Sequence, residues 1–179
     1  MSARTGHRLR DLPHLARRFF WSLRPQQPDP QDEAWLVSLL TASERQLYEA
    51  QPLADRAHSV ACAVAARDGL RNAADDVIVA SALHDVGKAK ARLGTFGRVA
   101  ATVVDAIVPA SVNQRWAAPA DGWRARMFLY ARHDHVGADL LREAGSADVV
   151  VVWAAEHHLP ETEWSIDPHI GRVLLAADG

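Results

Sequence analysis

An apolar run, Val77-Ile78-Val79-Ala80, leads within a few residues to the pair His84-Asp85 and then to Gly87. Such a run predicts a buried helix, and glycine commonly follows the last turn of a helix. Two adjacent side chains of metal-ligand type at the end of a buried helix cost free energy unless a partner binds them. We therefore expect a partner at this point, and a metal ion is the leading hypothesis.

Helical patterns cover most of the chain after residue 30. Thr41-Ala42-Ser43-Glu44 has the sequence of a capping box at a helix start. Helices are predicted from Pro52 to Gly69, from about Ala73 to Asp85, and then over 96–107, 123–131, 136–143, 148–157 and 169–177. The β-branched stretch 149–153 would also suit a strand, but no second strand pattern pairs with it. The sequence predicts an all-α fold, a single-domain helical bundle.

Three segments are expected. Residues 1–24 are basic and aromatic and predict an N-terminal helix, residues 25–30 form a Pro-rich linker, and residues 31–179 form the helical domain. The first helix could contact a membrane or nucleic acid through its arginines. We favour the alternative that it docks its aromatic side chains on the domain.

Composition narrows the class of protein. Of 179 residues, 49% are hydrophobic and the net charge is -2, so there is no overall attraction to nucleic acid or to an anionic membrane. One cysteine, Cys62, excludes an internal disulfide framework. No apolar stretch approaches the roughly 20 residues of a transmembrane segment, and no secretory signal is evident. A cytoplasmic protein is expected, and its oligomeric state is left unassigned.

Further histidines and one aspartate could join His84-Asp85. On a helix, two adjacent side chains diverge by about 100°, which suits an aspartate between two ions with His84 on one of them. Antiparallel packing of the two helices before Gly87 could bring His58 beside His84. Imidazole together with carboxylate suits divalent Fe, Mn, Zn, Ni or Co. The other candidates, in chain order, are His133, His157, His158 and Asp178.

The order H…HD…H…HH…D resembles the HD superfamily of metal-dependent phosphohydrolases, in its binuclear branch. The resemblance is carried by Ala82-Leu83-His84-Asp85-Val86-Gly87-Lys88, by the H-x-x-x-G helix start at His133, and by Glu156-His157-His158. It implies one ion on His58, His84, Asp85 and Asp178. It implies a second ion on Asp85, His133, His157 and His158, with a water between the two ions as the nucleophile.

The resemblance also implies hydrolysis of a phosphoester or phosphoanhydride, with a nucleotide or dinucleotide as the expected substrate. Asp85 and Lys88 are the predicted catalytic residues, and Lys88 and Arg132 are expected to contact phosphate. Residues 159–164 lack the glycine-tyrosine-proline signature of cyclic dinucleotide phosphodiesterases, which disfavours that activity without excluding it. A nucleotide- or metal-binding sensor with little or no turnover is the other alternative. His135, two residues from His133, should point to solvent or act as an outer partner of the ligands.

Overall fold

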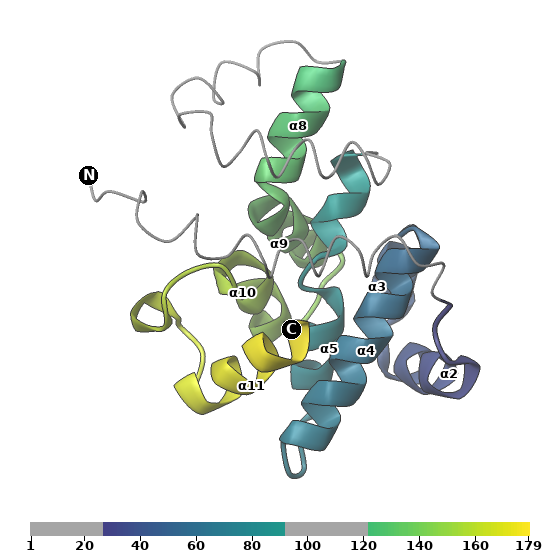
Figure 1. Ribbon diagram of the computed structural model, residues 1–179, viewed down its shortest axis with the longest axis vertical. Helices are drawn as coiled ribbons and strands as arrows, with labels where there is room; N and C mark the ends of the chain where they lie inside the picture. Colours follow the sequence, from purple (N-terminus) through teal and green to yellow (C-terminus); the bar gives the residue numbers. More distant parts are fainter. Residues whose placement is uncertain (1–26, 92–121) are drawn as a thin grey trace.

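The computed structural model describes residues 27–91 and 122–179, and every regular element within these ranges is helical. The chain order is α2 (Pro30–Leu39), α3 (Ala42–Glu49), α4 (Leu53–Gly69), α5 (Asp75–Leu83), η1 (Val86–Ala91), α8 (Trp123–Ala131), α9 (His133–Glu143), α10 (Asp148–Glu156), η3 (Glu161–Glu163) and α11 (Pro168–Asp178). The all-α bundle predicted from the sequence is confirmed (Figure 1). The helix expected over 1–24 and the pattern over 96–107 lie outside the described residues.

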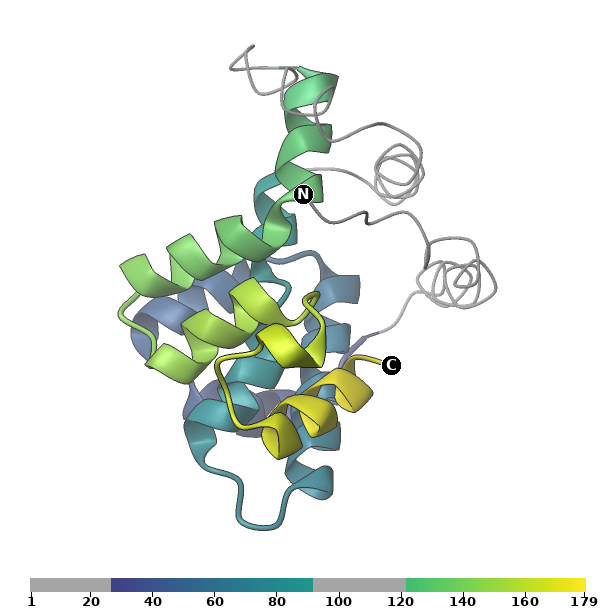
Figure 2. The same ribbon diagram turned by 90° about the vertical axis from the view of Figure 1, so that its left-hand side faces the viewer.

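Helix α5 forms the centre of the bundle. Its residues from Val77 to Leu83 are all buried, as expected for a helix that is apolar on every face. Helices α4, α10 and α11 pack against it (Figure 1), and α9 lies beside α10 on the outer side (Figure 2). The β-branched stretch that could have formed a strand is part of α10. This arrangement brings the end of α5 into the interior of the protein.

The structure moves two expected boundaries. Helix α5 begins at Asp75 and ends at Leu83, and after Asp85 the chain continues as the 3-10 helix η1. Gly87 therefore lies inside a helical segment and does not end one. Pro30 takes the first position of α2, where proline needs no hydrogen-bond partner for its nitrogen, instead of the end of the linker. Asp29 caps that helix through its side chain.

A capping box fixes the start of α3, and a polar network ties α2 and α3 to α4, the helix that carries His58. The capping box of α3 is present as predicted: the Thr41 N–H donates to Glu44 Oε2 at 2.9 Å, and the Glu44 N–H donates to Thr41 Oγ1 at 3.3 Å. The buried Tyr48 hydroxyl then donates to Glu33 Oε1 at 2.7 Å. Arg56, in the first turns of α4, pairs with the same carboxylate. Helices α2 and α3 are thus held to the start of α4.

Across the described parts of the chain, we find no helix with both the length and the apolar composition needed to cross a membrane.

Candidate metal centre

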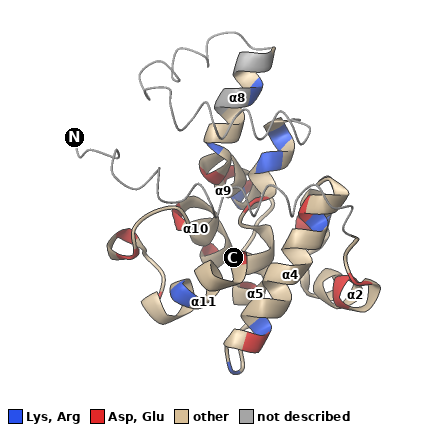
Figure 3. Cartoon of the chain, in the orientation of Figure 1, with Lys and Arg blue, Asp and Glu red and all other residues tan. Residues whose placement is uncertain are grey.

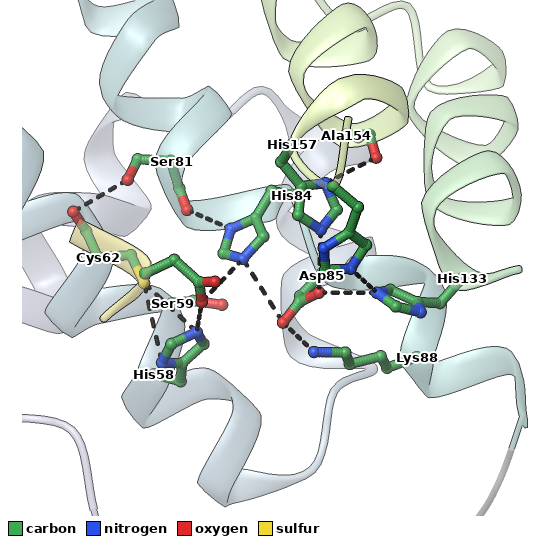
Figure 4. Close-up of polar contacts among 12 residues, drawn as sticks. His58, Ser59, Cys62, Ser81, His84, Asp85, Lys88, His133, Ala154 and His157 are labelled. Carbon is green, nitrogen blue, oxygen red and sulfur yellow. Dashed lines mark hydrogen bonds and ion pairs between the residues drawn. The ribbon is translucent and has the colours of Figure 1, made fainter. Parts of the chain in front are cut away.

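The candidate ligands come from five helices and meet at one place in the bundle (Figure 4). His58 lies in the second turn of α4, His84 and Asp85 directly follow α5, and His133 is the first residue of α9. His157 and His158 follow α10, and Asp178 is the last residue of α11. Most of this set lies at helix ends, and His58 lies within a helix. Seven residues spread over 121 positions of sequence thus share one site.

Four of these residues form one cluster, which we name the Asp178 group: His58, His84, Asp85 and Asp178. Asp178 Oδ1 lies 3.0 Å from His58 Nε2 and 3.4 Å from His84 Nε2. His84 Nε2 lies 3.5 Å from Asp85 Oδ2. Donor atoms that each lie about 2.1 Å from one ion are separated from each other by about 3.0–3.4 Å. The separations in this group therefore suit a single bound cation.

Three histidines form a second cluster, the three-histidine group: His133, His157 and His158. The Nε2 atoms of His133 and His158 lie 3.2 Å apart. The imidazole rings of His157 and His158 lie close together, with 3.9 Å between their centroids. Three imidazole nitrogens without a carboxylate of their own form a borderline-soft donor set, which suits first-row transition ions better than Mg²⁺ or Ca²⁺.

The carboxylate of Asp85 lies between the two groups. Its Oδ2 faces His84, while its Oδ1 lies 3.2 Å from His133 Nε2 and 3.8 Å from His157 Nε2. Asp85 is 7% exposed, so water can shield this charge only slightly. The sequence argument that adjacent side chains diverge, with His84 on one side and Asp85 shared, matches this geometry. One oxygen of Asp85 thus faces each group.

Backbone carbonyls fix which nitrogen of each ring faces the site. The Nδ1 of His84 donates to the Ser81 carbonyl at 2.7 Å, and the Nδ1 of His133 donates to the Tyr130 carbonyl at 2.8 Å. The Nδ1 of His157 lies 3.0 Å from the Ala154 carbonyl. A carbonyl oxygen can only accept, so each Nδ1 carries the proton and each neutral ring presents an unprotonated Nε2. This is the tautomer that metal binding requires.

Two of those Nε2 atoms have no hydrogen-bond partner of normal geometry among the described residues. They belong to His84 and His157, which are 2% and 3% exposed. An unsatisfied buried nitrogen costs about 1–3 kcal/mol, and both point toward carboxylate oxygens at 3.4–3.8 Å. A cation between the nitrogens and the carboxylates would satisfy them. The residues present therefore fit a metal centre.

Charge and burial act in opposite directions on the pKa values of the Asp178 group. Burial alone would raise the pKa of Asp85, but the positive charge of Lys88, together with His84 and His133, holds it well below the usual range. Burial alone would lower the pKa of His84, but the carboxylates of Asp85 and Asp178 outweigh it and raise the pKa. The shared carboxylate is therefore ionised and able to bind a cation.

The three-histidine group shows the opposite behaviour. Burial, reinforced by the nearby His84 and His158, lowers the pKa of His157 to about 2. Loss of hydration, reinforced by His133, lowers the pKa of His158 to about 4. These two rings stay neutral in the folded protein at every physiological pH, so a proton does not compete with a metal for them.

These shifts predict an acid-sensitive fold. Below pH 6.5 the unfolded chain binds a proton at His157 that the folded chain does not bind, so stability falls as the pH falls towards about 2. The loss from this residue at pH 5 is about 2 kcal/mol. The raised pKa of His84 acts in the opposite direction, but its contribution is complete below the unfolded-state pKa of about 6.5, whereas the loss at His157 continues below it. Urea unfolding of the chelated protein at pH 7 and pH 5 measures the loss.

The control for this measurement is His135→Gln, which replaces an exposed histidine and should leave the pH dependence unchanged. His157→Gln should weaken it. Equal stability of the wild-type protein at the two pH values would contradict the neutral, buried state of His157.

Of the two expected phosphate-binding residues, Lys88 lies beside the centre and forms an ion pair with Asp85 Oδ2. Arg132 is exposed at the junction of α8 and α9 and precedes His133 in the chain. Their contact with phosphate stays a prediction. His135 is exposed, as expected from its position two residues after His133.

Cys62 is fully buried, and its Sγ lies 3.5 Å from His58 Nε2, as their spacing of four residues on α4 allows. One feature of the site was not expected from the sequence. Gly87 crosses the backbone of α9: a Cβ on Gly87 would lie 2.0 Å from the His133 carbonyl oxygen and 2.6 Å from the Gly137 nitrogen. This crossing holds Asp85 against His133. The sequence shows Gly87 and Gly137, but not that their backbones are in close contact.

Comparison with known proteins identifies no relative: no family model, no curated protein and no solved structure matches this chain. The functional argument therefore rests on the motif residues and on the geometry of the two groups. The likeness to the HD superfamily is accordingly used below as part of a proposal.

Proposed function

We propose that this chain is a metal-dependent phosphohydrolase of the HD type. It would use two divalent transition ions, from among Fe, Mn, Ni, Co and Zn, to cleave a phosphoester or phosphoanhydride bond in a nucleotide or dinucleotide. The observation that carries the proposal is the position of Asp85, whose two oxygens face two separate groups of imidazole side chains. A single structural ion would need only one of these groups.

The roles of the side chains follow from their positions. His58, His84 and Asp178 would hold one ion, the three-histidine group would hold the other, and Asp85 would be shared. Two ions bound in this way lower the pKa of a water between them and stabilise the attacking and leaving oxygens of an in-line displacement. Lys88 and Arg132 would attract and orient the phosphate, because an ammonium and a guanidinium next to the centre complement its negative charge.

The segment after His158 bears on the substrate. Residues 159–164 contain the 3-10 helix η3 and end at Trp164, whose ring packs edge-on against Trp153 at 5.4 Å and whose Nε1 donates to the Leu159 carbonyl at 3.1 Å. This short packed turn supplies no glycine-tyrosine-proline segment. It supports a nucleotide or dinucleotide in preference to a cyclic dinucleotide as substrate.

A metal analysis followed by a hydrolysis screen tests the proposal. The protein is loaded separately with Mn, Fe, Co, Ni and Zn and assayed against nucleoside monophosphates, dinucleoside tetraphosphates, alarmones and cyclic dinucleotides. We expect phosphate release or nucleotide cleavage with at least one ion. His133→Ala should lose this activity, by about 100-fold or more.

His135→Ala is the matched control, because it removes a histidine from the same helix that is exposed and outside both groups. It should retain wild-type activity. Metal binding without turnover of any of these substrates would contradict the proposed enzymatic function and would favour a metal- or nucleotide-binding sensor. Equal losses in the two variants would remove the evidence that the three-histidine group does the chemistry.

A further inference from the structure

We propose that Lys88 competes with the metal for Asp85, and that metal binding displaces its ammonium group towards the incoming phosphate. Lys88 would thus be a conformational element that couples metal loading to substrate binding. This inference rests on the proposed metal centre and adds a movement that the proposed function does not require.

The first argument is the position of the ion pair. Lys88 Nζ contacts Asp85 Oδ2, and the same oxygen lies 3.5 Å from His84 Nε2 (Figure 4). Oδ2 is thus the oxygen that Asp85 would offer to an ion in the Asp178 group. An ion bound there and the ammonium of Lys88 would be partners of one carboxylate oxygen.

The second argument is electrostatic. A divalent cation and an ammonium on the same oxygen lie within about 4–5 Å of each other. At that distance they repel strongly even at an effective dielectric constant near 20. The carboxylate is buried, so water screens this repulsion weakly. Besides Asp85, two imidazoles and Asp178 face the position of the divalent ion and would hold it there. The metal ion should therefore displace the ammonium of Lys88 from Asp85.

The third argument is that Lys88 can move while its backbone cannot. The preceding residue, Gly87, is fixed by its close crossing with α9. The Lys88 side chain is 18% exposed and has a flexible four-carbon stem, so its ammonium can turn to solvent without a change in η1. In Figure 3 the basic stretch of η1 lies beside α8 and α9, the helices that flank Arg132. A displaced ammonium would meet a phosphate on this side.

The sequence provides its own reference for a test, because it contains two lysines, Lys88 and Lys90, and both lie in η1. Lys90 is exposed. The chelated and the Mn²⁺-loaded full-length protein are treated briefly with an amine-acetylating reagent, and labelling of each lysine is measured by mass spectrometry. Metal loading should raise the labelling of Lys88 relative to Lys90 at least about threefold. An unchanged or lower ratio contradicts displacement.

A binding measurement tests the competition itself. Lys88→Met removes the charge and keeps the length of the side chain, and Lys90→Met removes the same charge two residues away. By calorimetry, Lys88→Met should bind Mn²⁺ at least about tenfold more tightly than the wild-type protein. Lys90→Met should differ from wild type by less than about twofold, because its charge is exposed and screened. Unchanged or weaker binding by Lys88→Met contradicts the inference.

The two proposals fail in different ways. If the wild-type protein binds no Mn²⁺ or other transition ion, the metal centre and the competition are both wrong. If it binds metal but Lys88 labelling and affinity do not respond, the competition alone is wrong and the metal centre stands.

Discussion

Asp85→Asn is expected to abolish metal binding at both groups and to reduce hydrolysis by at least about 100-fold. Loss of a hydrogen-bond partner behind a metal ligand already costs up to about 100-fold in affinity or activity, and loss of the ligand itself should cost more. The reason is that one buried carboxylate faces both clusters, with Oδ1 3.2 Å from His133 and Oδ2 3.5 Å from His84. Asparagine keeps the volume but has no charge and only one oxygen. Metal content by mass spectrometry and turnover on the best substrate of the screen measure the effect.

Asp139→Asn is the matched control for that prediction. Asp139 is exposed on α9, where it pairs with Arg142 at 2.6 Å, and it belongs to neither group. Its replacement should leave metal content and turnover unchanged. If Asp85→Asn retains a full complement of metal, Asp85 is not the shared ligand.

Gly87→Ala is expected to destabilise the fold by about 3 kcal/mol and to weaken metal binding at the three-histidine group. The added Cβ would lie 2.0 Å from the carbonyl oxygen of His133 and 2.6 Å from the nitrogen of Gly137. Both are backbone atoms, so no change of rotamer relieves the clash, and α9 must move away from η1. Because His133 begins α9, its Nε2 moves away from Asp85. Urea unfolding and metal titration measure the two effects.

Gly69→Ala provides a comparison in which the clash is with a side chain. Its Cβ would lie 2.7 Å from Val173 Cγ1, a side-chain atom of α11. Gly69 is the last residue of α4, far along that helix from His58. We expect a smaller loss of stability than in Gly87→Ala and no loss of metal binding at the three-histidine group, because the clash does not involve α9. Equal effects of the two substitutions would mean that the Gly87 crossing does not position the site.

The sequence predicts most of the helices of this protein because each has a local signal. These signals are the capping box at Thr41, the apolar run before His84 and Gly69 at the end of α4. Each depends on only a few neighbouring residues. The helix start at His133 was also expected. The boundary at Gly87 was wrong because glycine has two uses that look alike in a sequence. It can end a helix, or it can let two backbones approach, and only the contact with Gly137 distinguishes them.

The sequence predicts which residues belong to the candidate site, but not all the contacts that each of them makes. The resemblance to the HD superfamily implied that His58, His84 and Asp178 form one group, and the structure brings them within ligand distance of one another. The proximity of Cys62 to His58 follows from their spacing of four residues on α4. Residue type and order do not show which ring nitrogen faces the site, because that depends on the backbone carbonyls to which the Nδ1 atoms of His84 and His133 donate.

Anomalous X-ray diffraction from crystals of the Mn- or Zn-loaded protein tests the central claim most directly, because it locates the ions without reference to activity. The two-ion account predicts one peak within the Asp178 group and a second within the three-histidine group, with the Asp85 carboxylate between them. A single peak, or no peak in contact with Asp85, would contradict it.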